Sequence, residues 1–190
     1  IVLLNKKLVS QGVSQTLSLL KNAFEQESIK ELKEIGAESA SELLIKGIPA
    51  LLEVSLIAYS LSKFLEKPYI TRARKWNGFR KKVLERLEKS VLLMEKNRLR
   101  AGHEFLKKIV VEIEGMSFSH GRFVASTVEK ARIKAAAQVY AHGASLGKSA
   151  ELTGASKSEL AKYIGITRLH EKYRTMSVRE RLDLAEELFE

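Results

Sequence analysis

The sequence predicts an all-α protein built as a bundle of several helices. Leu, Ala, Glu and Lys are abundant and only 2 of the 190 residues are proline, a composition that favours helix because these side chains lose little rotamer freedom there. Aromatic residues make up only 7% of the chain, and alternating runs of β-branched residues are scarce, which argues against a large sheet. The 45% hydrophobic content suffices for one sizeable core or two small ones.

Apolar spacing and breaker residues place the expected helices of the first third. Residues 8–35 carry apolar side chains three to five positions apart, which predicts one or two amphipathic helices. Gly36 is expected to stop this stretch, and Gly47 to end a short helix after it. Pro49 suits the first turn of a further helix, which Pro68 then closes.

A basic and aromatic elbow is expected over 69–78, where Asn77-Gly78 gives a turn signal. It divides the chain into an N-terminal helical region, 1–68, and a helical domain, 79–190.

Three helices are expected in the first half of that domain. The first begins at Phe79 and extends towards residue 100, and the second covers about 102–114 and ends at Gly115. Ser117 or Ser119 is expected to start an Ala-rich helix that runs to about His142 and stops at Gly143.

Positive charge is concentrated in one segment. The net charge is +10, and residues 71–110 alone hold 13 basic and 4 acidic side chains. Such a local excess attracts polyanions, because neutralising each phosphate releases counterions. A solvated basic face without a partner is the alternative interpretation.

The spacing changes after Gly143 into two short helices joined by a tight turn. Ala150 is small where the helices would cross, and Gly154 can adopt the positive φ that such a turn requires. Ser156 is suited to cap the second helix, with Glu159 completing a capping box.

This segment, 146–165, resembles the helix-turn-helix of bacterial and archaeal DNA-binding regulators, whose pattern is Ala-Glu-apolar-x-Gly-x-Ser-x-x-x-apolar. It departs at Ser149, where the family has a branched aliphatic residue, and this predicts looser packing of the first helix. Residues 131–165 bear a looser likeness to the end of a cyclin-type repeat of archaeal transcription factor B, which implies a five-helix unit. The full expectation is thus an all-α multi-helix bundle with a C-terminal helix-turn-helix.

The resemblance implies a transcription-related DNA-binding protein, with duplex DNA as partner and the second helix in the major groove. Base contacts are expected from the exposed start of that helix: Lys157, Ser158 and Lys162. If Glu159 is not used in the cap, its carboxylate can accept a hydrogen bond from cytosine. Phosphate contacts are expected from the flanking and basic-segment residues, namely Ser156, Lys148, Arg168, Arg72, Arg74, Lys75, Arg80, Lys81 and Lys82.

Two other uses of these segments stay open. The chain is alternatively a helical adaptor or RNA-binding protein that uses basic segment 71–100, with the helix-turn-helix as scaffold only. A short terminal helix is expected either to close the core or to form a homodimer contact, through an apolar stripe that consists of Val178, Leu182, Ala185, Leu188 and Phe189.

Enzyme, metal and membrane functions find no support in the sequence. Cysteine is absent, no two of the four histidines stand at i, i+4 spacing, and no P-loop or dinucleotide motif occurs. We therefore expect no catalytic residue, no metal and no cofactor. The longest apolar stretch, 48–65, is interrupted by Glu53 and indicates a core helix rather than a membrane span, so a cytoplasmic protein is expected.

Overall fold

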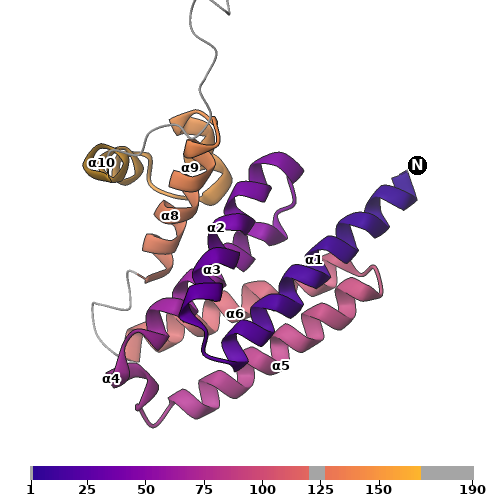
Figure 1. Cartoon of the computed structure of the whole chain (residues 1–190), viewed down its shortest axis with the longest axis vertical. Coiled ribbons are helices and arrows are strands. Elements are labelled where there is room, and N and C mark those ends of the chain that lie inside the picture. Colours follow the sequence, from indigo (N-terminus) through magenta and orange to yellow (C-terminus); the bar gives the residue numbers. More distant parts are fainter. Residues whose placement is uncertain (1, 120–126, 168–190) are drawn as a thin grey trace, which may run out of the picture.

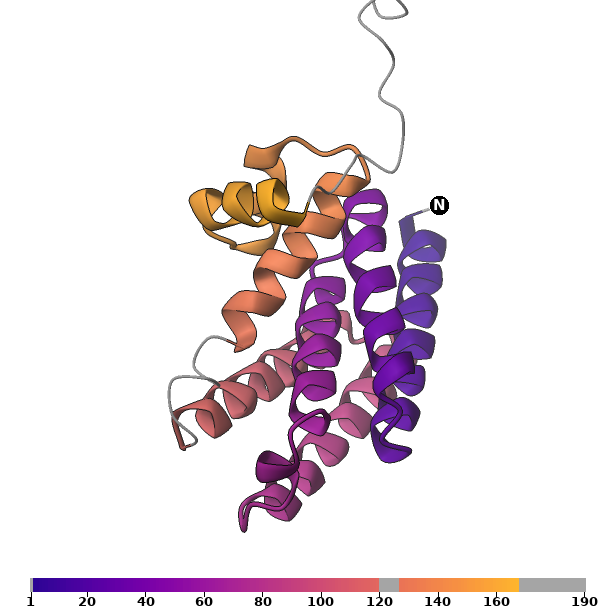
Figure 2. The same cartoon turned by 60° about the vertical axis from the view of Figure 1, so that its left-hand side comes forward.

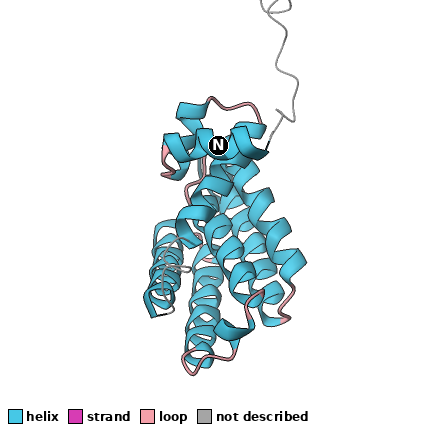
Figure 3. Ribbon diagram, turned by 90° about the vertical axis from the view of Figure 1, so that its left-hand side faces the viewer, coloured by secondary structure: helices cyan, strands magenta, loops and turns pink. Residues whose placement is uncertain are grey.

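The computed structural model describes residues 2–119 and 127–167. Every regular element in these two ranges is a helix, and no strand occurs among them (Figure 3). The helices are α1 (Val2–Glu25), α2 (Ile29–Lys46), α3 (Ala50–Leu65), α4 (Pro68–Thr71), α5 (Trp76–Glu95), α6 (Leu99–Ser119), α8 (Thr127–Ala141), α9 (Leu146–Thr153) and α10 (Lys157–Thr167). The expected all-α class is confirmed for this part of the chain.

The long helices α1, α2, α3, α5 and α6 form the bundle, and α8 to α10 lie at one end of it (Figures 1 and 2). Within the bundle α2 pairs with α3, α1 with α5, and α5 with α6, while α3 also packs against α6. Helix α8 rests on α2 and α3 and carries α9 and α10.

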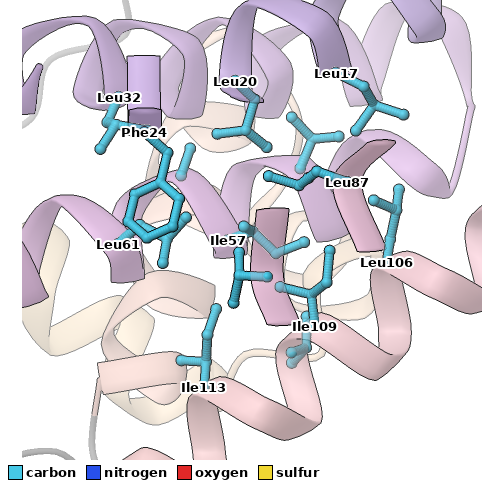
Figure 4. Close-up of a cluster of buried hydrophobic side chains, with 14 of the residues drawn as sticks. Leu17, Leu20, Phe24, Leu32, Ile57, Leu61, Leu87, Leu106, Ile109 and Ile113 are labelled. Atoms are coloured by element: carbon cyan, nitrogen blue, oxygen red, sulfur yellow. The ribbon is translucent and has the colours of Figure 1, made fainter. Parts of the chain in front are cut away.

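A single large cluster of apolar side chains holds the bundle together (Figure 4). It draws on every long helix of the bundle, through side chains such as Leu17, Leu32, Ile57, Leu87 and Ile109, all fully buried. Each such side chain contributes about 1.5–3 kcal/mol on removal from water. The cluster contains residues from both sides of the expected 69–78 elbow and reaches into α8.

Gly36 does not end a helix, contrary to the prediction. Helix α2 runs through it to Lys46, and the chain turns earlier, at Gln26–Ser28. Gly36 is buried where α2 crosses α3: a Cβ placed there would lie 3.4 Å from the Ala58 Cβ. The glycine therefore permits a close helix contact, which local spacing does not distinguish from a stop signal. Gly47, by contrast, is confirmed as a helix end, with a φ of 60°.

The Asn77-Gly78 pair forms no turn either, because both residues lie in the first turn of α5. Pro68 opens the short helix α4, and the link from there to α5 is only 72–75. The break between α5 and α6 falls at Asn97, whose φ is 57°. Asparagine tolerates this left-handed conformation better than most residues.

Two further boundaries differ from expectation. Helix α6 continues through Gly115 to Ser119, so neither Ser117 nor Ser119 starts the Ala-rich helix. That helix, α8, is described from Thr127 to Ala141, and the chain turns at Gly143 with a φ of 96°.

Over the described residues, no helix is both long enough and apolar enough to cross a bilayer.

Candidate nucleic-acid interface

Helices α8, α9 and α10 pack together around a small apolar cluster of their own. Its buried members are Ala136, Ala137, Ala150 and Leu160. Half-buried side chains surround them: Leu146, Ala155, Tyr163 and Ile164. Because three of the four buried residues are alanine, the helices approach closely and Leu160 is the only large, fully enclosed side chain among them.

The turn between α9 and α10 depends on Gly154. Its φ is 66°, the left-handed conformation that glycine adopts without strain. Arg132 of α8 donates from Nη1 to the Thr153 carbonyl over 3.1 Å, and a Cβ on Gly154 would lie 3.2 Å from that nitrogen. The absence of a Cβ at Gly154 therefore permits both the left-handed φ and the close approach of the Arg132 guanidinium, which links the turn to α8.

Hydroxyl groups stabilise helix α9, including the one at Ser149, where the helix-turn-helix pattern has a branched aliphatic residue. Ser149 is fully buried, and its Oγ donates to the Ser145 carbonyl over 2.9 Å. Thr153, also fully buried, donates to the Ser149 carbonyl over 2.8 Å. The Ser145 Oγ accepts the N–H of Lys148 over 3.1 Å and caps the helix. Each buried hydroxyl therefore has a partner, so Ser149 leaves no unsatisfied polar atom in the interior.

The start of α10 is only loosely capped. The Glu159 N–H lies 3.5 Å from the Ser156 Oγ, at the outer limit of a hydrogen bond, and the Ser158 Oγ lies 3.0 Å from the same atom. The Glu159 carboxylate forms no hydrogen bond or ion pair with the described part of the chain. The first half of the expected capping box is present in weak form, and the carboxylate stays in solvent.

The predicted base-contact residues share the exposed surface of α10. Lys157, Ser158 and Lys162 are all exposed, as is Ser156 just before the helix. Neither lysine forms an ion pair with any residue of 9–116 or 127–167. Across the helix from Ser158 and Lys162, Leu160 is fully buried against α8 and α9, while Lys157 is exposed at the first residue of the helix, one turn before Leu160. Helix α10 thus has one seated side and one free side.

Two residues, Lys148 and Arg168, were predicted to flank the major groove, and the structure describes only Lys148. Lys148 is exposed and its Nζ lies 3.2 Å from the Glu151 carboxylate, a solvent-accessible pair of small energetic weight. Arg168 lies outside the described residues.

The basic residues predicted over 72–82 lie in the link that follows α4 and in the first half of α5, at the opposite end of the molecule from α10 (Figures 1 and 2). Four of these side chains are exposed and form no ion pair with a described residue: Arg72, Arg74, Lys75 and Lys81.

Arg80 and Lys82 of the same group are partly engaged within the protein. Arg80 is half-buried, donates from Nη2 to the Glu25 carbonyl over 2.9 Å, and lies 6.0 Å from the centre of the Phe24 ring. It thereby ties the end of α1 to α5. The Lys82 Nζ lies 3.9 Å from Glu112 on α6 and is otherwise exposed. Arg80 is thus less available to a phosphate than the sequence suggested.

Lys134 was not singled out from the sequence, yet it connects α10 to the bundle. Its Nζ lies 5.6 Å from the centre of the Tyr163 ring on α10 and 6.0 Å from that of Tyr59 on α3. Hydrogen bonding to Tyr163 raises the pKa of Lys134, so the ammonium stays charged at neutral pH. These three residues are far apart in sequence, and only the tertiary packing brings them together.

The described residues contain no group of three or more side chains placed to hold a metal ion. Comparison with protein-family models, with curated proteins and with solved structures gives no match to this chain.

Proposed function

We propose that this protein binds duplex DNA through α9 and α10, with the exposed start of α10 entering the major groove. The observation that carries the proposal is the two-sided character of α10. Leu160 seats one side on α8 and α9, while Lys157, Ser158 and Lys162 face solvent without an acidic partner among the described residues.

The chemistry of these side chains suits a base edge and its neighbouring phosphates. A lysine ammonium donates to the O6 and N7 acceptors of guanine, and a serine hydroxyl bonds to either a donor or an acceptor. The N–H groups at the start of α10 are only loosely capped by the exposed Ser156, and such N–H groups suit a phosphate. The free Glu159 carboxylate can accept from the cytosine amino group.

A second candidate function rests on the other end of the molecule. The unpaired cations Arg72, Arg74, Lys75 and Lys81 form a basic surface of their own. In that case the protein is an adaptor or RNA-binding protein, and α9–α10 serve only as scaffold.

A binding titration separates the two candidates. The full chain is titrated with random duplex DNA of about 30 base pairs, single-stranded DNA and duplex RNA at about 50 mM and 200 mM salt. The test variant is Lys157→Ala with Lys162→Ala. The control is Lys30→Ala with Lys46→Ala, which removes two exposed lysines from α2 and changes the net charge equally.

We expect duplex DNA to be preferred and the α10 variant to bind it about tenfold more weakly or worse, since two ammonium groups that attract the phosphates are lost from the contact surface. The α2 variant should stay close to the parent protein. Equal losses in the two variants would contradict groove contact by α10. Loss only when the charges over 72–81 are removed would favour the second candidate.

A further inference from the structure

A cavity of about 300 Å³ lies between α2, α3 and α8, where the bundle meets the helices that carry α10. Its floor is made of small residues of α2 and α8, among them Gly36, Ala40, Ala131 and Ala135. Because these side chains are at most a methyl group, they leave a space that larger residues would fill. The volume is at the lower end of that of small-molecule sites in proteins.

Three lysines line this cavity, one from each helix: Lys33 of α2, Lys63 of α3 and Lys134 of α8. Tyr59 and Gln138 add a phenol ring and an amide. The ammonium groups of Lys63 and Lys134 lie 5.8 Å and 6.0 Å from the centre of the Tyr59 ring, so the ring and the charges share one space. A small apolar floor with a few converging polar groups is the usual composition of a ligand site.

The charges in this site do not cancel. Lys33 and Lys63 share one carboxylate, that of Glu66, at 2.7 Å each. Lys134 has no carboxylate within ion-pair distance in the described part of the chain, and none of the residues lining the cavity is acidic. Three cations balanced by one anion leave a net charge of about +2 beside an apolar floor, which favours an anionic ligand.

We propose that this cavity binds a small organic anion that carries a carboxylate on a flat apolar body. The carboxylate would lie between Lys63 and Lys134, and the apolar body would occupy the space above the alanines beside the Tyr59 ring. A hydrated inorganic ion would leave the alanine floor uncovered, so the apolar part is needed to gain from displacing water there. The inference does not depend on DNA binding by α10.

Calorimetric titration with 2-naphthoate tests the proposal, with 2-naphthamide as the uncharged probe of the same shape. Lys134→Met removes one cation and keeps a long side chain. Its matched control is Lys89→Met, at an exposed position of α5 outside the cavity. Ala37→Met fills the cavity from a half-buried position, and Ala101→Met is its exposed control on α6.

We expect 2-naphthoate to bind about tenfold more tightly than the amide, because one ion pair in a partly buried site contributes about that much affinity. Lys134→Met should remove most of this preference, and Ala37→Met should weaken both probes, while the two controls bind like the parent. Thermal unfolding of each variant shows whether it is folded. The proposal would be overturned if 2-naphthoate did not saturate the protein at millimolar concentration, or if the two probes bound with equal affinity. It would also be overturned if neither Lys134→Met nor Ala37→Met changed the affinity for the probes.

Discussion

Gly154 holds the turn between α9 and α10 in a backbone conformation that residues with a Cβ avoid, at a φ of 66°. We expect Gly154→Ala to lower the free energy of unfolding by about 1–2 kcal/mol, because of the left-handed φ and the contact with the Arg132 guanidinium at 3.2 Å. Gly165→Ala is the control, since that glycine lies inside α10 and a Cβ there meets nothing within 4 Å. It should gain about 0.5–1 kcal/mol instead. Urea unfolding followed by circular dichroism measures both, and a neutral Gly154→Ala would refute the argument.

Glu66 joins α2 to α3 by accepting from Lys33 and Lys63, and these two hydrogen bonds hold the pKa of its carboxyl below the ordinary value of 4.5. A lowered carboxyl pKa stabilises the fold at neutral pH, and the contribution is lost as the pH falls through the folded-state pKa. Glu66→Gln should therefore cost about 0.5–1 kcal/mol at pH 7, discounted for partial exposure, and nothing once Glu66 is protonated. Urea unfolding at pH 7 and again at about pH 2, where the carboxyl is protonated, checks this, with Glu31→Gln at an exposed, unpaired position of α2 as control.

The sequence predicts a helix and its ends correctly where neighbouring residues determine them. It predicts them poorly where contacts with another helix determine them. Apolar spacing identifies the helical class and the α9–α10 pair, whose Gly154 has the expected left-handed φ. It misreads Gly36, because a glycine at a helix crossing resembles a glycine at a helix end until α3 is in place. It also misses the Asn97 break, since no glycine or proline marks it.

The candidate site divides in the same way. The exposure of Ser158 and Lys162 follows from their phase relative to Leu160 on one helix, so the sequence alone could predict it, whereas Lys157 is exposed because it is the first residue of α10. The contact of Lys134 with Tyr163 joins residues on α8 and α10. The cavity between α2, α3 and α8 likewise needs helices that are distant in the sequence, and no local pattern encodes it.

Leu160 is the one large buried side chain that packs α10 against its neighbours among the described residues, so its truncation should unfold α10 locally. Leu160→Ala should cost about 2–4 kcal/mol, because the alanines around it cannot close the space left behind. We expect amide exchange in Lys157–Thr167 to lose its protection, while fluorescence of Trp76, buried between Phe24 and Phe79, reports an unchanged bundle. Ile166→Ala, at a side chain 72% exposed, is the control and should leave exchange as in the parent. Concerted loss of both signals would contradict independent opening of α10.

Within the described residues, the bundle has one continuous apolar core that reaches from α1 through α6 into α8, and α8 to α10 share a second, small apolar cluster. Two separated basic surfaces lie outside these clusters. One is the exposed side of α10. The other is the group of cations without an ion pair among the described residues in the link between α4 and α5 and at the start of α5. Helix α3, which lies between these ends, has 16 residues and is therefore about 24 Å long. A ligand that contacts both surfaces must run along the molecule for at least that length.

This separation makes the contribution of each surface depend on the length of the duplex. A duplex of about 12 base pairs is about 40 Å long, so when α10 sits in the groove at its centre only about 20 Å extends to either side, which is less than the separation of about 24 Å from the α4–α5 end. We therefore expect Arg72→Ala with Arg74→Ala to leave affinity for this duplex unchanged and to lower affinity for one of about 30 base pairs by several-fold, with a smaller salt slope. Lys157→Ala with Lys162→Ala should weaken both lengths. If the arginine variant weakened both duplexes equally, the basic end would be a separate nucleic-acid site, and α10 would not set the orientation of the DNA.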